Sequence, residues 1–138
     1  MARPRFAVQH FLACPTVEID RAELGNPYTL REVRYNFAVP AEQEWPVRLP
    51  DLWLYARFFN GQGTREFTIQ VDWFDRKEEV CEYLGIRVVF PPQLSVHSRV
   101  WRLVNVRYPG PGRYRFRLRD GKSRMILATE YINLEKHP

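Results

Sequence analysis

Short apolar runs broken by Pro, Gly, Asn and Asp extend along the whole chain. From Phe67 to Trp73, apolar and polar side chains alternate with the period of two that is typical of a strand with one buried face. Leu52 to Phe59 is almost wholly apolar and fits a central strand. Asn60-Gly61-Gln62-Gly63 between them is typical of a hairpin turn, because glycine tolerates positive φ. An antiparallel hairpin is therefore predicted over Leu52 to Phe74.

The same punctuation delimits further strands, and Thr16 to Asp20 can extend the first of them past a kink at Pro15. These strands are Phe6 to Cys14, Tyr28 to Val39, Ile86 to Phe90, Val96 to Tyr108, Arg113 to Arg119 and Met125 to Leu134. Val96 to Tyr108 is long enough to require a bulge or a bend. The Asp120-Gly121 turn joins the last two strands into a final hairpin. About eight strands with short turns and no intervening helix indicate a sandwich or a small barrel.

One stretch, Asp75 to Tyr83, fits two structures. Its charged run fits two helical turns, or a turn followed by a short edge strand. Two helical turns are too short to be stable without tertiary support. Both alternatives remain open from the sequence.

Tyr114 decides between sandwich and barrel. It follows the sharp Pro111-Gly112 turn at the start of the penultimate strand. Sandwich domains place a tyrosine there, with its ring in the core and its hydroxyl bonded to upstream backbone. We therefore predict a single all-β domain over residues 1–138, an immunoglobulin-like antiparallel β-sandwich of about eight strands.

The composition fits one such domain. The chain has 138 residues, of which 45% are apolar and 14% aromatic, enough for a packed core. No apolar run approaches the roughly 20 residues of a membrane helix, and no signal-peptide pattern follows the basic N-terminus. We expect a cytoplasmic protein in which Cys14 and Cys81 are reduced thiols; a disulfide between them is the alternative reading.

The segment Tyr108-Pro109-Gly110-Pro111-Gly112-Arg113-Tyr114-Arg115-Phe116-Arg117-Leu118, with the following turn and last strand, resembles the C-terminal half of an uncharacterised bacterial protein family. Members of that family are small, are expected to be immunoglobulin-like sandwiches, and have no assigned function. Cys14, the strand from Tyr28 to Val33 and the stretch from Leu52 to Phe74 fit the same outline. The resemblance implies the fold and supplies no functional residues.

Catalytic and metal-binding patterns are missing from the sequence. His10, His97 and His137 are far apart, and no phosphate loop, nucleophile elbow or metal-ligand spacing occurs. His10 and Cys14 lie about 13 Å apart along a strand, too far to act together. We expect a non-enzymatic protein without a cofactor or metal.

Positive charge is concentrated in the C-terminal part. The formal net charge is +5, and Arg113, Arg115, Arg117 and Arg119 alternate so that all four side chains leave one face of a strand. Their spacing of roughly 6.6 Å is close to that of phosphates along a nucleic acid, so a phosphate-tracking surface is one hypothesis, and Arg99, Arg102, Arg107 and Arg124 can widen it. The alternative is an ordinary solvated sheet face with Glu66, Asp72 or Glu130 as counter-charges, which we favour because Tyr114 and Phe116 point into the core instead of offering a stacking platform.

Trp45 is the second candidate. It lies in a polar loop between Pro40 and Pro50, where an exposed tryptophan can anchor an interface or fold back over the end of the sandwich. We therefore predict a module that binds another protein, or itself through its sheet edges. Its partner-binding residues are Trp45, Arg113, Arg115, Arg117 and Arg119. An electrostatic nucleic-acid-binding domain is the alternative, and no membrane contact is expected.

Overall fold

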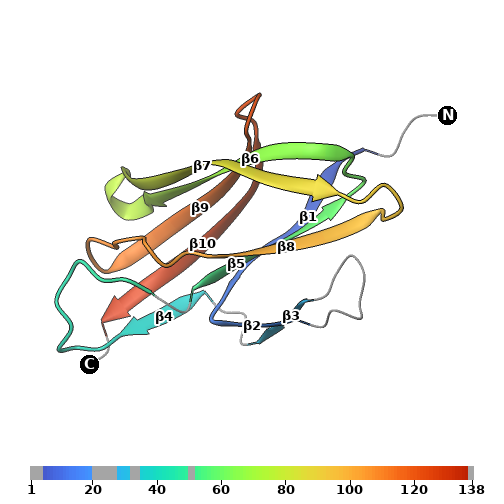
Figure 1. The fold of residues 1–138 in the computed structure, drawn as a ribbon. Helices are drawn as coiled ribbons and strands as arrows, with labels where there is room; N and C mark the ends of the chain where they lie inside the picture. Colours follow the sequence, from blue (N-terminus) through green and yellow to red (C-terminus); the bar gives the residue numbers. More distant parts are fainter. Residues whose placement is uncertain (1–4, 20–27, 32–34, 50–51, 137–138) are drawn as a thin grey trace.

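Two β-sheets pack face to face in the computed structural model of the protein, and a separate two-stranded ribbon lies beside the smaller sheet (Figure 1). The structure describes residues 5–19, 28–31, 35–49 and 52–136. Within these residues the chain forms ten strands and one short 3₁₀ turn, η1 (Phe74–Arg76). The predicted all-β sandwich is confirmed. No helix in the described part of the chain is long and apolar enough to cross a membrane.

The larger sheet has the order β4-β10-β9-β6-β7. Its strands are β4 (Asn36–Val39), β6 (Gly63–Trp73), β7 (Glu78–Phe90), β9 (Gly112–Asp120) and β10 (Ile126–Lys136). All neighbours are antiparallel except β4, which runs parallel to β10. In an immunoglobulin sandwich, one sheet contains the third, the penultimate and the last strand side by side. Here β6, β9 and β10 take those places and β7 is an added edge strand, so the immunoglobulin-like topology is confirmed.

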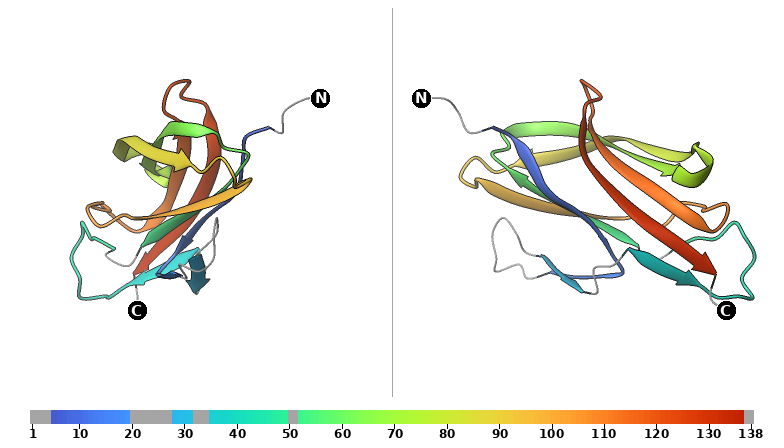
Figure 2. Two further views of the ribbon diagram at one scale, coloured as in Figure 1. Left: turned by 45° about the vertical axis from the view of Figure 1, so that its right-hand side comes forward. Right: turned by 180° about the vertical axis from the view of Figure 1, so that it is seen from behind.

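The smaller sheet has the order β1-β5-β8. Its strands are β1 (Ala7–Cys14), β5 (Trp53–Phe59) and β8 (Val96–Arg102), and the ribbon consists of β2 (Thr16–Ile19) and β3 (Tyr28–Arg31). Tyr28 of the ribbon contacts Tyr55 of β5, with ring centroids 6.3 Å apart, and Tyr55 is only 5% exposed. The ribbon therefore covers part of the outer side of this sheet (Figure 2).

The core lies between the inner faces of the two sheets. Phe58 of β5 packs on Phe67 of β6 with ring centroids 5.1 Å apart, and Phe90 of β7 contacts both rings. Alternate residues of β9 point inward and are fully buried, because a strand turns successive side chains to opposite faces. These inward residues are Tyr114, Phe116 and Leu118.

The expected tyrosine corner is present. The Tyr114 hydroxyl donates to the Gly110 carbonyl at 2.6 Å and accepts from the Gly110 amide at 3.2 Å. The ring is fully buried and stacks on Trp73. These two hydrogen bonds attach the connection before β9 to the core. Burial raises the pKa of Tyr114 to about 12.

The hairpin predicted over Leu52 to Phe74 is wrong. β5 pairs with β1 and β8, whereas β6 pairs with β7 and β9, so the two strands lie in different sheets. The Asn60–Gly63 turn crosses from one sheet to the other, and the apolar faces of the two strands meet across the core. A glycine-rich turn between two apolar strands fits either connection, since both place the same side chains in the interior.

Four other predictions can be compared with the strands. The single strand predicted over Tyr28 to Val39 is wrong: β3 lies in the ribbon and β4 pairs with β10, and residues 32–34 between them lie outside the described residues. The strand predicted over Val96 to Tyr108 is shorter than expected: β8 ends at Arg102, and Tyr108 forms only a separate bridge with Val47. Asp75 to Tyr83 forms η1 followed by the start of β7, the second of the two alternatives. The final hairpin of β9 and β10 is confirmed.

Candidate binding surface

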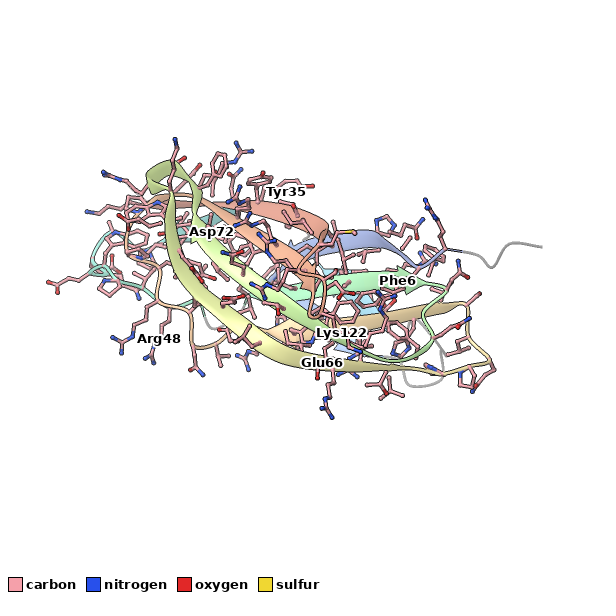
Figure 3. All side chains as sticks on the ribbon, turned by 90° about the horizontal axis from the view of Figure 1, so that it is seen from above. Phe6, Tyr35, Arg48, Glu66, Asp72 and Lys122 are labelled. Atoms are coloured by element: carbon pink, nitrogen blue, oxygen red, sulfur yellow. The ribbon has the colours of Figure 1, made fainter. Side chains whose placement is uncertain are left out.

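The arginines of β9 lie together on the side of the larger sheet that faces away from the core, hereafter the outer face. Asp72 of β6, which lies beside them on this face, is labelled in Figure 3. The register places Thr68, Gln70 and Asp72 of β6 on one side of them, and Thr129 and Tyr131 of β10 on the other. The orientation predicted for Arg113, Arg115, Arg117 and Arg119 is therefore the one observed. Among the described residues, no strand or ribbon covers this face.

Asp72 is the counter-charge of two of the arginines. Its Oδ2 accepts from Arg117 Nη2 at 2.7 Å and from Arg115 Nη2 and Nε at 3.0 and 3.3 Å. The Asp72 side chain is 8% exposed, and those of Arg115 and Arg117 are 26% and 16% exposed. Two guanidinium groups thus share one largely buried carboxylate oxygen.

Glu66 and Glu130, the other counter-charges considered, have different roles. Glu66 pairs with Arg87 of β7. Glu130 is 6% exposed and pairs in register with the inward-facing Phe116, so it lies on the core side of β10. Burial raises the pKa of Glu130, and its carboxylate accepts from the Tyr131 amide.

Arg119 and Arg124 are also bonded within the chain. Arg119 donates to the Gln70 amide oxygen at 3.1 Å and to the Arg124 carbonyl at 2.9 Å. Arg124 donates to the Thr68 hydroxyl and forms an ion pair with Glu82 of β7. Partial burial, together with the positive charges of Arg117 and Arg124, lowers the pKa of Arg119.

Arg113 is arranged differently, because it stacks on rings. Its guanidinium lies over Tyr131 and Phe74, at 4.6 and 5.7 Å from the ring centroids. Arg115 also lies over Phe74, at 5.3 Å, and the two rings meet edge to face at 5.5 Å. These four side chains form an aromatic–arginine cluster at the η1 end of the outer face. Phe74 is 38% exposed, so part of its ring is available to a partner.

An open pocket of about 720 Å³ adjoins the cluster. It is lined by Asp72, Phe74, Asp75, Lys77, Glu79, Arg115 and Arg117. Asp75 accepts from the Arg113 amide at 2.8 Å, which ties η1 to the start of β9. The lining carries both signs of charge beside one apolar ring.

The wider arginine patch is formed only in part. Arg124 lies on the outer face, through its contacts with Thr68 and Glu82. Arg99 and Arg102 belong to β8 of the smaller sheet and do not extend the patch. Arg107 follows β8, next to the bridge residue Tyr108.

Trp45 lies apart from the arginines. It is half-buried in the loop after β4 and packs against the core, whereas the arginines point away from it. Of the two alternatives for Trp45, folding back over the end of the sandwich fits this packing.

The Pro91–Leu94 connection and the Asn60–Gly63 turn border a second hollow, of about 480 Å³, whose lining is uncharged.

Both cysteines are free thiols, as predicted, and no disulfide joins them. Cys14 is fully buried. Burial raises the pKa of the Cys81 thiol to about 11. Within the described residues, no group of three His, Cys, Asp or Glu side chains is placed to hold a metal ion. His97 lies half-buried at the edge strand β8, where burial and the nearby Arg99 lower its pKa.

Sequence reasoning did not identify Phe74, Tyr131 or the pocket. The spacing of Thr129, Tyr131 and Asn133 on the last strand carries a signal, because it places Tyr131 on the polar face. Phe74 carries none, since its position depends on η1 folding toward β9.

No family model and no curated protein matches the chain. Among solved structures, an immunoglobulin-like protein from Pseudomonas aeruginosa is similar, with 12% identity and a TM-score of 0.47 over 98% of this chain and all of that one. A Pseudomonas fluorescens alkylpurine DNA glycosylase, AlkC, bound to DNA with an abasic-site analogue, has 10% identity and a TM-score of 0.47 over 97% of this chain and 31% of that one.

Proposed function

We propose that the protein is a non-enzymatic binding or assembly module that contacts a protein partner through the outer face. The aromatic–arginine cluster carries this proposal. Arg and Tyr are enriched among the residues that dominate protein–protein binding energy, and Phe74 leaves part of its ring exposed. The stacking of Arg113 and Arg115 on the rings orders these side chains before binding, which lowers the entropic cost of association.

The charge pattern favours a protein over a nucleic acid. Asp72, Asp75, Glu79 and Glu82 lie among the arginines, and Asp72 and Glu82 form ion pairs with them. A surface that tracks phosphates gains its affinity from unpaired cations that release counterions, and internal carboxylates weaken that gain. Charges of mixed sign instead contribute to the specificity of protein association.

Site-specific photo-cross-linking tests the proposal. A photoreactive residue at position 74, in protein expressed in its native cells, should give one discrete cross-linked protein species. Arg113→Glu should remove that species without lowering the thermal midpoint by more than a few degrees. The matched control carries the same photoreactive residue at Val104, which is 41% exposed outside the larger sheet. Equal cross-linking from both positions would contradict the proposal.

Nucleic-acid binding, the alternative, rests on the alternation of arginines along β9. Labelled DNA and RNA titrated at rising salt distinguish the two functions. Binding that weakens steeply with salt and is lost in Arg115→Glu/Arg117→Glu would support the alternative. We expect no binding beyond the weak, sequence-independent background of a basic protein.

A further inference from the structure

Two cross-strand rows on the outer face each have a carboxylate of β7 and an arginine of β9 on opposite sides of β6. In the first row, the register aligns Glu79 of β7 with Asp72 of β6 and Arg115 of β9. In the second row, it aligns Glu82, which also pairs with Arg124 of the same chain, with Gln70 and Arg117. Each row therefore has a carboxylate on one side of β6 and an arginine at the same level on the other side.

This arrangement is self-complementary. A two-fold axis parallel to β6, above the outer face, exchanges the two sides of β6 and keeps each row at its own level. It places β9 of one copy over β7 of the other, so Arg115 meets Glu79 and Arg117 meets Glu82. Isologous dimers require this property, a patch that matches itself after a half-turn. Sheets that pack face to face with nearly aligned strands provide the corresponding geometry.

We propose that the outer face binds a second copy of this chain, forming a two-fold dimer in which the β7 carboxylates of each copy face the β9 arginines of the other. The proposal rests on the proposed function and names the partner. Asp72 of the two copies would meet near the axis, but its charge is balanced within each chain by Arg115 and Arg117. Five strands spaced by about 4.8 Å give a face roughly 24 Å wide, and the nine residues of β9 give it a length of roughly 30 Å. The area of about 700 Å² is close to the roughly 800 Å² per partner of a stable interface.

Two of the sheet edges, β7 and β8, are poorly suited to the same task. β7 contains Gly85 at φ +68° beside a break in the register with β6, and a bulge of this kind twists an edge away from pairing. In β8, Arg99 aligns with the core residue Ala56 and therefore points inward. An inward-pointing charge on an edge strand disfavours the addition of another strand at that edge. These features favour packing through the face over pairing through the edges.

Glu79 is the most informative residue to substitute in a test of the dimer, because it is exposed and forms no ion pair within the described part of the chain. Sedimentation equilibrium of the full chain at 50 mM salt should show a monomer–dimer equilibrium. Glu79→Arg should weaken dimerisation at least tenfold, and raising the salt to 500 mM should weaken the wild-type dimer. Glu44→Arg makes the same charge change in the exposed loop before Trp45 and should leave the dimer intact.

Charge reversal in the second copy gives the decisive result. Glu79→Arg mixed with Arg115→Glu should form a heterodimer, although each variant alone dimerises at least tenfold more weakly than the wild type. If Arg115→Glu fails to fold, Glu79→Ala replaces this arm and should weaken the dimer several-fold without changing the circular dichroism spectrum. A wild-type dimer that Glu79→Arg leaves unchanged would overturn the proposal.

The two proposals fail separately. A monomeric wild-type chain that still gives an Arg113-dependent cross-link to a different protein would refute the dimer and leave the proposed function standing. A monomeric chain with no such cross-link would refute both.

Discussion

Arg117 donates to Asp72 at 2.7 Å, on a carboxylate oxygen that Arg115 shares. Asp72→Ala leaves two mostly buried guanidiniums without their acceptor, so we expect the free energy of unfolding to fall by about 3 kcal/mol. Urea unfolding at neutral pH measures this loss. Glu44→Ala, in an exposed loop away from the outer face, is the control and should change stability by less than about 0.5 kcal/mol. Equal losses in both variants would show that Asp72 is no more important to the fold than a surface charge.

The tyrosine corner gives a second prediction. Tyr114→Phe keeps the buried ring and removes the hydroxyl that bonds the Gly110 carbonyl and amide. We expect a loss of about 2 kcal/mol, because the change leaves buried backbone groups without a partner. Tyr131→Phe, also on the larger sheet, is the matched control and should be nearly neutral by thermal unfolding, since its ring stacking is retained.

Asp120 predicts a dependence of stability on acid. Its Oδ1 accepts from the Lys122 and Ser123 amides, and its Oδ2 accepts from Arg65 at 2.9 Å. These bonds lower the pKa of Asp120 to about 2. A lowered pKa stabilises the fold above the pKa of the unfolded chain, and this contribution is lost as the pH falls toward 2.

The measurement is chemical unfolding of wild type and Asp120→Asn at several pH values. At pH 6 the wild type should be more stable by about 2 kcal/mol, and the difference should shrink between pH 4 and 2. Glu42→Gln, in an exposed loop, should show no such convergence. A difference that stays constant with pH would mean that ionisation of Asp120 contributes nothing to stability.

The strand pattern predicted the fold class because alternation and turn residues are local signals. Tyr114 could be placed from sequence since its position after a sharp turn determines both its burial and its hydroxyl bond. The partner sheet of each strand could not be predicted. β5 and β6 have apolar faces that fit a hairpin and a sandwich crossing equally well. The two are distinguished by strand pairing, since β5 pairs with β1 and β8 whereas β6 pairs with β7 and β9.

The candidate surface, too, could be predicted from the sequence only in part. Alternation alone placed the four arginines of β9 on one face. Their pairing with Asp72 depends on β9 lying beside β6, two strands separated by more than thirty residues of chain. The cluster around Phe74 depends in addition on η1, a turn that the sequence left undecided. The sequence alone therefore suggests a row of free cations. The pairing of β9 with β6 shows instead a surface on which arginines and carboxylates are mixed.

Trp45 provides the final prediction, because its packing and its proposed partner role have different consequences. The side chain is half-buried against the core in the loop after β4. Trp45→Ala should lower the free energy of unfolding by about 2 kcal/mol, from lost apolar burial and the space left behind. The cross-link from position 74 should survive at temperatures where the variant stays folded. Unchanged stability with loss of that cross-link would instead make Trp45 an interface anchor, and the binding surface would then extend beyond the outer face.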